Sequence, residues 1–294
     1  YRIKIAIADV GDYNFDSAVF LEANSFGTSA FHADVDYKLP NNDNYAVEGC
    51  TGANAVLTFT IPKPLDEDFT LNYTIEGTAE NCVDYVVLPD STCLETSITI
   101  PTGQTTAQIE IYAIDDGIVE GTETINLIFT NSCGESDMIT INIVDYSLPL
   151  ASAFGGASFC ESAIVPTQIG VNVSGGVAPY TYLWSEGAGT QKNPIITPAE
   201  TTNYHVVVTD YCNYSTTSDV LITVYPDPIV YAVAEPQSVC AGSSSTLTAF
   251  GADTYMWIGF SNNENPIVVK PNQTASYIVV GTNSDTGCFS NDTI

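Results

Sequence analysis

The stretch from residue 108 to residue 128 reads Gln108-Ile109-Glu110-Ile111-Tyr112-Ala113-Ile114-Asp115-Asp116-Gly117-Ile118-Val119-Glu120-Gly121-Thr122-Glu123-Thr124-Ile125-Asn126-Leu127-Ile128. Its two flanks alternate apolar and polar residues, which is the period of a half-buried β-strand. The middle carries four carboxylates within nine residues. Anions this close repel one another unless a cation lies among them, and oxygen ligands from a loop suit Ca²⁺ before Mg²⁺. The stretch therefore predicts two strands joined by a calcium-binding loop.

Length and charge restrict the class of protein. A chain of 294 residues is long enough for two or three compact domains. It carries 35 Asp and Glu but only six Lys and Arg, with no basic residue between Pro64 and Gln191. Phosphate recognition needs clustered Lys and Arg, so this composition excludes nucleic acid and anionic membranes as partners.

The rest of the composition favours strands over helices. Charged residues make up only 14%, and Gly and Pro interrupt the chain at short intervals between segments rich in Thr, Val, Ile and Tyr. No segment sustains a helical apolar period, and none approaches the roughly 18 apolar residues of a membrane span. We expect an all-β protein with many short strands and no membrane insertion.

The cysteines indicate an oxidising compartment. They number eight, and they are Cys50, Cys82, Cys93, Cys133, Cys160, Cys212, Cys240 and Cys288. None forms a CxxC pair with a neighbour, so disulfides are favoured over zinc. We expect an exported, extracellular or cell-surface protein. Because the chain opens at Tyr1 and stops at Ile294 in a strand-like segment, we also expect it to be a piece of a longer protein.

The last 140 or so residues contain an internal repeat. The first copy contains Cys160, Trp184, Asn193-Pro194-Ile195, Tyr204 and Cys212, and the second contains Cys240, Trp257, Asn265-Pro266-Ile267, Tyr277 and Cys288. This order resembles an immunoglobulin-like sandwich, in which a buried Trp lies beside a disulfide between the sheets. The resemblance implies the pairs Cys160–Cys212 and Cys240–Cys288. It also places both tryptophans in cores rather than on sugar-binding surfaces.

Upstream of the repeats, alternating strands are expected at residues 55–61, 69–75, 97–100, 107–113, 123–130 and 138–144. The motifs between them are Val47-Glu48-Gly49, Glu76-Gly77-Thr78-Ala79, Val83-Asp84-Tyr85, Ile100-Pro101-Thr102-Gly103, the acidic loop and Ile141-Asn142-Ile143-Val144-Asp145. In order and spacing they resemble the Calx-β domain.

The Calx-β resemblance implies calcium held at one end of a sandwich by carboxylates from several loops. Carried over position by position, the ligands are Glu48, Asp84, Asp115, Asp116, Glu120, Glu123 and Asp145. We expect one or two ions, because the terminal Asp145-Tyr146 lacks a longer run of aspartates. The alternative is an ordinary solvated acidic loop. A weaker set, Asp9, Asp12 and Asp16, is explained as well by the preference of Asp for turns.

The outer parts of the chain also carry resemblances. The N-terminal segments Ile5-Ala6-Ile7-Ala8-Asp9-Val10-Gly11-Asp12 and Phe15-Asp16-Ser17-Ala18-Val19-Phe20-Leu21-Glu22 resemble the closing hairpin of the choice-of-anchor L domain of exported Bacteroidota surface proteins. The two C-terminal units resemble PKD-like or Ig-like repeats of Bacteroidota adhesins. The expected domains are a hairpin at 1–32, a Calx-β-like sandwich at 33–148, and Ig-like/PKD-like repeats at 149–226 and 227–294. Short proline-bearing linkers predict tandem antiparallel sandwiches in a semi-rigid rod.

Four cysteines outside the repeats allow three connectivities, of which we expect Cys82 with Cys93 and Cys50 with Cys133. Asp16-Ser17-Ala18 and Asp292-Thr293-Ile294 resemble the short Bacteroidota O-glycosylation motif, which makes Ser17 and Thr293 candidate glycosylation sites.

Catalysis finds little support in the sequence. The histidines, His32 and His205, fall in different domains, there is no GxSxG motif, and the cysteines are expected to be paired. We predict a non-catalytic extracellular structural or adhesive segment of a large secreted bacterial surface protein, rigidified by disulfides and calcium. Its partners would be copies of itself or cell-surface glycans or proteins. Two alternatives stay open: a filament subunit whose strand at residues 3–8 completes a sheet in the next copy, and a glycan-binding adhesin module.

Overall fold

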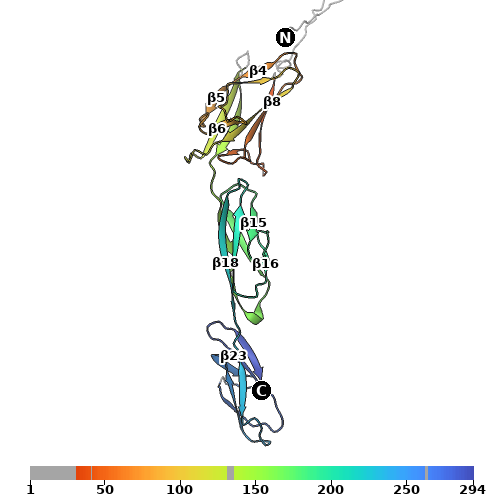
Figure 1. Cartoon of the computed structure of the whole chain (residues 1–294), viewed down its shortest axis with the longest axis vertical. Helices are drawn as coiled ribbons and strands as arrows, with labels where there is room; N and C mark the ends of the chain where they lie inside the picture. The colour runs from red at the N-terminus through yellow and green to blue at the C-terminus, as the bar shows by residue number, and fades with distance from the viewer. Residues whose placement is uncertain (1–30, 41, 131–135, 262–263) are drawn as a thin grey trace, which may run out of the picture. The chain divides into compact units, whose positions relative to one another are not determined.

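A computed structural model describes residues 31–40, 42–130, 136–261 and 264–294 (Figure 1). The chain divides into two compact units, Tyr1–Tyr146 and Ser147–Ile294. The described residues form β-strands, with one short 3₁₀ turn at Glu161–Ala163 and no α-helix. None of the described segments has the length and apolarity of a membrane-spanning helix. The predicted all-β class is confirmed.

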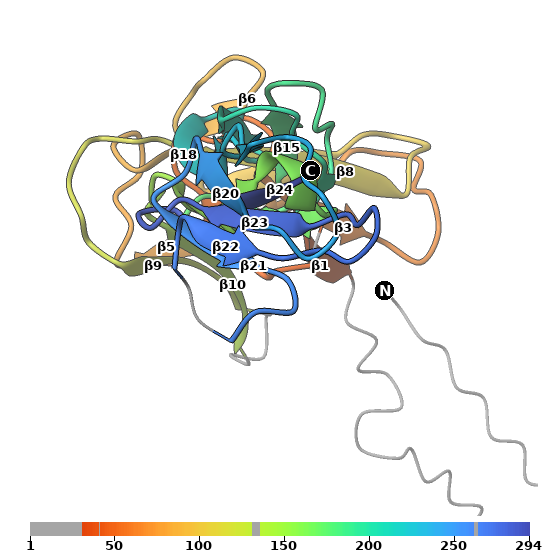
Figure 2. The same cartoon turned by 90° about the horizontal axis from the view of Figure 1, so that it is seen from below.

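Unit 1 is a sandwich of two four-stranded sheets with an added two-stranded ribbon. Its strands are β1 (His32–Tyr37), β2 (Ala46–Val47), β3 (Ala55–Thr60), β4 (Phe69–Asn72), β5 (Thr74–Gly77), β6 (Tyr85–Leu88), β7 (Ser97–Ile100), β8 (Thr106–Ala113), β9 (Thr122–Thr130) and β10 (Ser136–Val144). The sheets have the orders β1-β3-β8-β6 and β2-β10-β9-β5, and the ribbon is β4-β7. Figure 2 shows β5, β9 and β10 next to one another. All pairings are antiparallel except that of β2 with β10.

The expected strands of unit 1 are present, except that one of them is divided into two strands. The strand predicted over residues 69–75 changes sheets at Tyr73, because β4 pairs with β7 whereas β5 pairs with β9. The sequence reading missed β1, β2 and β6 as separate strands. Each of these is an edge strand of its sheet, and short or edge strands carry little periodic signal.

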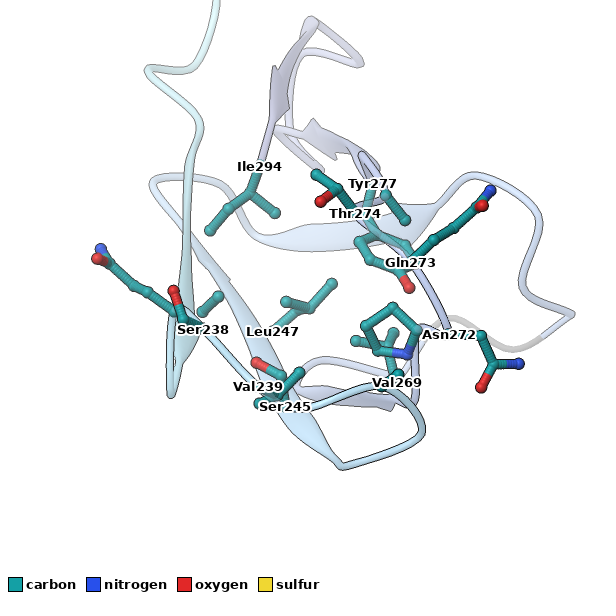
Figure 3. A pocket seen from close by; sticks show the side chains of 15 residues that line it. Ser238, Val239, Ser245, Leu247, Val269, Asn272, Gln273, Thr274, Tyr277 and Ile294 are labelled. Atoms are coloured by element: carbon teal, nitrogen blue, oxygen red, sulfur yellow. The ribbon is translucent and has the colours of Figure 1, made fainter.

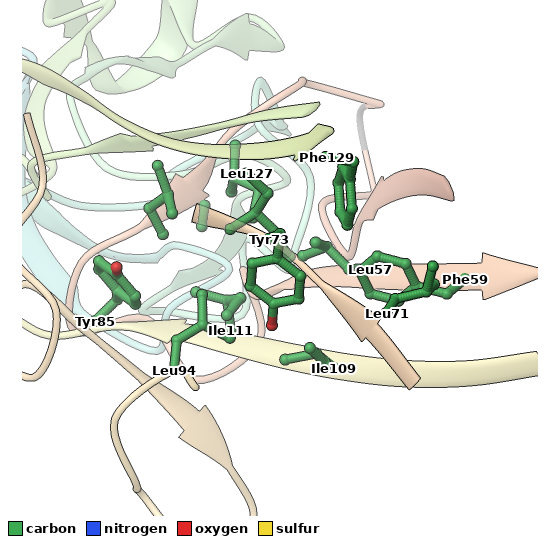
Figure 4. Close-up of a cluster of buried hydrophobic side chains, with 14 of the residues drawn as sticks. Leu57, Phe59, Leu71, Tyr73, Tyr85, Leu94, Ile109, Ile111, Leu127 and Phe129 are labelled. Atoms are coloured by element: carbon green, nitrogen blue, oxygen red, sulfur yellow. The ribbon is translucent and has the colours of Figure 1, made fainter. Parts of the chain in front are cut away.

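The core of unit 1 follows from strict alternation along its central strands. In β3 and β9 every second residue is buried, so one face of each strand packs inward. Leu57, Ile111, Ile125 and Leu127 are fully buried in the core. Figure 4 shows Leu57, Ile111 and Leu127 among the packed side chains. Burying each such side chain contributes about 1.5–3 kcal/mol, so the alternating pattern fixes which face meets the core.

Unit 2 contains two separate sandwiches. The first is built from β11 (Leu150–Phe154), β12 (Ala157–Cys160), β13 (Thr167–Gln168), β14 (Gly170–Ser174), β15 (Thr181–Trp184), β16 (Ile195–Ile196), β17 (Thr202–Thr209) and β18 (Ser215–Tyr225). The second is built from β19 (Tyr231–Glu235), β20 (Ser245–Phe250), β21 (Thr254–Trp257), β22 (Ile267–Val269), β23 (Ile278–Thr282) and β24 (Phe289–Thr293). Their main sheets have the orders β12-β18-β17-β15, β19-β20-β22 and β21-β23-β24, and each sandwich has its own core.

The two tryptophans occupy equivalent core positions. Trp184 ends β15 opposite Val206, and Trp257 ends β21 opposite Val279. Their side chains are only 3% and 0% exposed, so the prediction that they pack in cores is confirmed. The indole N–H of Trp184 donates a hydrogen bond to the Gln191 carbonyl at 3.0 Å.

The disulfides agree with the sequence reading in part. Cys82 bonds Cys93, as expected. Cys160 bonds Cys288, and Cys240 is free and exposed, so the predicted pairs Cys160–Cys212 and Cys240–Cys288 are both wrong. Cys133 lies outside the described residues, and its pairing with Cys50 stays a prediction.

The reason for the error lies in where the strands place each cysteine. Cys160 ends β12 and lies opposite Tyr225 at the end of β18, whereas Cys212 lies in the turn before Ser215 begins β18. Ten residues of strand span about 33 Å, and a disulfide needs Cα atoms within about 4–7 Å. Cys240 and Cys288 are likewise separated by the length of β20, because Cys240 precedes its start and Cys288 lies beside the β21–β23 pair that follows its end.

The Cys160–Cys288 bond joins the two sandwiches of unit 2 and closes a loop of 128 residues. In the chain-entropy model a loop of this length stabilises the fold by up to about 5 kcal/mol. We expect the double variant Cys160→Ser/Cys288→Ser to lower the free energy of unfolding of unit 2 toward that extent. Urea titration followed by tryptophan fluorescence measures this change, because Trp184 and Trp257 both lie in unit 2.

Cys240→Ser is the matched control, since its thiol is exposed and unbonded. It should leave the urea midpoint unchanged. Equal midpoints for the double variant and the wild type would contradict the stabilising role of the bond.

Candidate metal centre

Five strand ends of unit 1 meet at one end of the sandwich. The start of β6 pairs with the end of β8 through Tyr85 and Ala113, and the start of β9 pairs with the end of β10 through Thr122 and Val144. The parallel pairing of β2 with β10 brings Val47 to the same end. The loops leaving these ends therefore converge.

All seven predicted ligands lie in these loops or next to them. Glu48 follows β2, Asp84 precedes β6, Asp115 and Asp116 follow β8, Glu120 and Glu123 lie at the start of β9, and Asp145 follows β10. Carboxylate oxygens of Asp84, Asp116 and Glu120 lie within 4.8 Å of one another. Glu48 and Glu123 are close enough to Asp116 and Asp145 for the charges of these aspartates to raise the pKa of both glutamates.

Three of the acids are buried. Glu48, Asp84 and Glu123 are 4%, 5% and 6% exposed, whereas Asp115, Asp116 and Glu120 are exposed. The Oε2 atom of Glu123 has no hydrogen-bond partner among the described residues, although it is buried. An ionised oxygen buried without a donor is costly unless a cation or a proton compensates it.

Backbone N–H groups orient several of the carboxylates. Asp145 accepts from the N–H groups of Glu120 at 3.2 Å and Gly121 at 2.7 Å, which ties the acidic loop to the end of β10. Asp115 accepts from Gly117 at 3.1 Å, and Asp116 accepts from Ile118 at 2.8 Å. These bonds use both oxygens of Asp145 and one oxygen each of Asp115 and Asp116, so the acids themselves shape the loop.

A glycine allows the close approach of this loop to β2. Gly49 has φ +64°, in the left-handed region, and an added Cβ would come to 3.0 Å from the Cβ of Asp115. Its N–H donates to the Ala113 carbonyl at 3.0 Å, which fixes Glu48 beside the end of β8. The sequence analysis named Gly49 within the Val47-Glu48-Gly49 motif but gave it no role. The signal that could have revealed this role is a glycine directly after a candidate ligand at the end of a strand.

Burial, together with repulsion from neighbouring acids, raises the pKa of two glutamates. Burial, with the charges of Asp145, Asp116, Glu123 and Asp115, raises the pKa of Glu48 to about 7. Burial and four neighbouring acids raise the pKa of Glu123 to about 6. The pKa of exposed Glu120 is also raised. Without a cation, this end of unit 1 holds protons at near-neutral pH.

The other predicted site residues are not part of this cluster. Asp9, Asp12, Asp16 and Ser17 lie outside the described residues, as does the expected N-terminal hairpin with its strand at 3–8. Thr293 is exposed in β24, and its glycosylation stays a prediction. A second close group, Cys160, Asp227 and Cys288, contains two sulfur atoms that are already joined in a disulfide.

Comparison with known proteins gives two family matches. The choice-of-anchor L domain matches residues 1–27, in agreement with the resemblance expected for the N-terminus, and the SprB repeat matches residues 168–189, within the first repeat. No curated protein matches the chain. Both matches cover short segments, and together they support a modular surface-protein architecture.

Several solved structures are similar at low identity. One is a 1.5-MDa bacterial ice-binding adhesin, with 12% identity over 90% of this chain and 96% of that chain and a TM-score of 0.39. A Ca²⁺-stabilized adhesin of an Antarctic bacterium has 11% identity over 89% and 72% and a TM-score of 0.38. The calcium-binding domain CBD12 of CALX1.1 has 14% identity over 74% and 80% and a TM-score of 0.32. Sequence identities and TM-scores this low give no basis for assigning a ligand to this chain, so the candidate site is argued from its own geometry.

The raised pKa values predict how stability depends on pH when divalent cations are removed. A carboxyl whose folded-state pKa exceeds its unfolded value stabilises the fold at low pH, and this stability is lost as pH rises through the folded pKa. The free energy of unfolding of unit 1 should therefore fall between pH 4.5 and about 7, the range set by Glu48. Calorimetry of the full chain in a chelator, at a series of pH values, measures this fall.

Glu48→Gln removes the largest of these shifts and should flatten much of the slope. Asp36→Asn, on exposed β1, is the control and should keep the wild-type slope. Stability of the wild type that rises over the same pH range would contradict the prediction.

Proposed function

We propose that this chain is a non-catalytic structural or adhesive segment of an exported cell-surface protein, in which calcium neutralises the acidic end of unit 1 and stiffens it. The observation that carries the proposal is the convergence of seven carboxylates, three of them buried, on five strand ends. The family matches to an anchor domain and a surface repeat support the extracellular setting.

Calcium fits this donor set by chemistry and by number. The candidate ligands are all oxygen atoms, and Ca²⁺ takes six to eight oxygens in flexible geometry, whereas Mg²⁺ demands a strict octahedron and keeps several waters. Asp84, Asp116 and Glu120 offer oxygens around one point, and the unpartnered oxygen of Glu123 offers another. We propose one or two ions, with Glu48, Asp115 and Asp145 completing the set.

The histidines support a non-catalytic role. His32 Nε2 lies 2.9 Å from Asp34, and His205 Nδ1 lies 3.0 Å from Asp219, each pair on one sheet face. The two pairs belong to different units, and neither histidine is a member of the carboxylate group formed by Asp84, Asp116 and Glu120. An exposed His–Asp pair of this kind has the geometry of a surface ion pair.

One observation favours a second candidate function, the binding of a surface glycan. Tyr231 and Phe250 form a stacked pair across β19 and β20, with ring centroids 5.3 Å apart and side chains 52% and 41% exposed. Exposed aromatic surface of this kind can serve as a ligand platform. Binding of the wild type to a glycan array that disappears in Tyr231→Ala would support this function, and equal binding by both would contradict it.

The calcium proposal is tested by thermal unfolding of the full chain with and without calcium. Calcium should raise the midpoint of unit 1, and a free concentration 100-fold above Kd corresponds to about 2.7 kcal/mol. Because both tryptophans lie in unit 2, fluorescence reports that unit, and calorimetry reveals the remaining transition. Calcium should raise the midpoint of the unit 1 transition seen by calorimetry and leave the fluorescence midpoint of unit 2 unchanged.

Asp116→Asn and Glu123→Gln each remove a proposed ligand and should weaken the calcium effect, with Glu123→Gln gaining stability in chelator. Asp36→Asn removes one exposed negative charge from β1, which carries none of the proposed ligands, and serves as the charge-matched control. A wild-type midpoint for unit 1 that does not respond to calcium would overturn the proposal.

A further inference from the structure

A pocket of about 340 Å³ in the second sandwich of unit 2 is lined by neutral side chains (Figure 3). Among the described residues that line it, which include Leu247, Val269 and Tyr277, none carries an acid, amine or thiol. A group of reactive side chains is found instead in unit 1. There Lys38, Asn54 and Glu110 bring an amine, a carboxamide and a carboxylate to one place.

Strand pairing brings these three residues together. Lys38 and Asn54 lie one position beyond the last residue pair of β1 with β3, and the backbone N–H of Lys38 donates to the Asn54 carbonyl at 2.9 Å. Glu110 lies on β8, the other neighbour of β3, opposite Val56. The three side chains therefore come from the ends or the middle of three adjacent strands of one sheet.

One carboxylate oxygen of Glu110 binds both nitrogen atoms. Its Oε1 atom accepts hydrogen bonds from Lys38 Nζ at 2.5 Å and from Asn54 Nδ2 at 2.7 Å. The two nitrogens thus lie within the combined length of these bonds, and the carboxylate oxygen joins them. A group in this position is placed to take a proton from one nitrogen and to give it to the other.

Burial of one member distinguishes this group from an ordinary surface ion pair. The side chains of Lys38 and Glu110 are 46% and 31% exposed, which is typical of such a pair. Asn54, in contrast, is only 3% exposed, and its Oδ1 atom is buried without a hydrogen-bond partner among the described residues. Because water is excluded from this carboxamide, the neighbouring amine is the nucleophile within reach of it.

We propose that Lys38 and Asn54 become joined by an amide bond between their side chains, with Glu110 as the catalytic residue that moves the protons. Glu110 takes a proton from the Lys38 ammonium, and the neutral Nζ attacks Cγ of Asn54. The Nζ–Cγ bond forms and the Cγ–Nδ2 bond breaks. The protons that Nζ loses pass through Glu110 to Nδ2, which leaves as ammonium, so the carboxylate is restored.

The reaction is slow in the resting structure. The bonds from Lys38 and Asn54 lower the pKa of Glu110, so the ion pair is favoured over the neutral pair that reacts. The linked fraction therefore grows with the age of the protein. The new bond fastens β1, an edge strand of its sheet, covalently to β3, and this role is separate from that of calcium.

The test is peptide mapping of the full chain after prolonged incubation below its unfolding transition. The cross-link lowers the intact mass by one ammonia, but so does cyclisation of an asparagine onto its own backbone. A protease that cuts after glutamate distinguishes the two, because Glu48 lies between Lys38 and Asn54. After the disulfides are reduced, the linked chain should give residues 23–48 and 49–67 as one species, whereas a cyclised asparagine leaves them separate.

Variants identify the reacting groups. Lys38→Arg keeps the positive charge but removes the amine, and Glu110→Gln removes the carboxylate that moves the protons. Both should abolish the linked species. Lys63→Arg and Glu76→Gln change exposed residues of the same unit outside the cluster, and these matched controls should keep the wild-type yield. Calorimetry of each variant shows that unit 1 is folded.

Two results would overturn the proposal. One is wild-type protein in which residues 23–48 and 49–67 are still separate at the end of the incubation. The other is a linked species that forms as fast in folded Glu110→Gln as in the wild type, which would show that Glu110 takes no part in the reaction.

Discussion

The repulsion among carboxylates at one end of unit 1 is the constraint on which the rest of that unit depends. Exposed Asp116 and Glu120 could turn toward solvent, but Glu48, Asp84 and Glu123 are held inward by strands whose pairing fixes them. Their charge can be relieved only by protons or by a cation. The topology therefore keeps these acids together, because moving them apart would break the ends of β2, β9 and β10.

The alternation of residues along β3, β8, β9 and β10 was enough to predict the sandwich, because each strand buries one face. The resemblance to the Calx-β domain predicted that seven acids lie at one end of the sandwich, and the structure brings the loops that carry them together. What the sequence could not provide was their separation into buried and exposed members. Burial of Glu48 depends on the parallel contact between β2 and β10, and a two-residue strand has no detectable period.

The cysteines show a different limit of sequence reading. An internal repeat identifies equivalent positions, and Cys160 and Cys240 are equivalent, yet one is bonded and the other is free. Which end of a strand a cysteine occupies follows from strand length and direction, and these depend on pairing partners distant in sequence. The parallel pairing of β12 with β18 determines the disulfide partner of Cys160, because it places Cys160 at the end of β18 that leads into the second sandwich.

The Cys160–Cys288 bond also determines how unit 2 responds to pulling. Tension applied at the two ends of the unit enters through β11 and β12, crosses the sulfur atoms and leaves through β24. The polypeptide between the two cysteines carries no load while the covalent bond is intact, and most of both cores lies within it. While the bond is intact, such a segment extends by only a short length under force. If the bond is reduced, the two sandwiches carry the load one after the other, so the redox state of the surroundings sets the mechanical response.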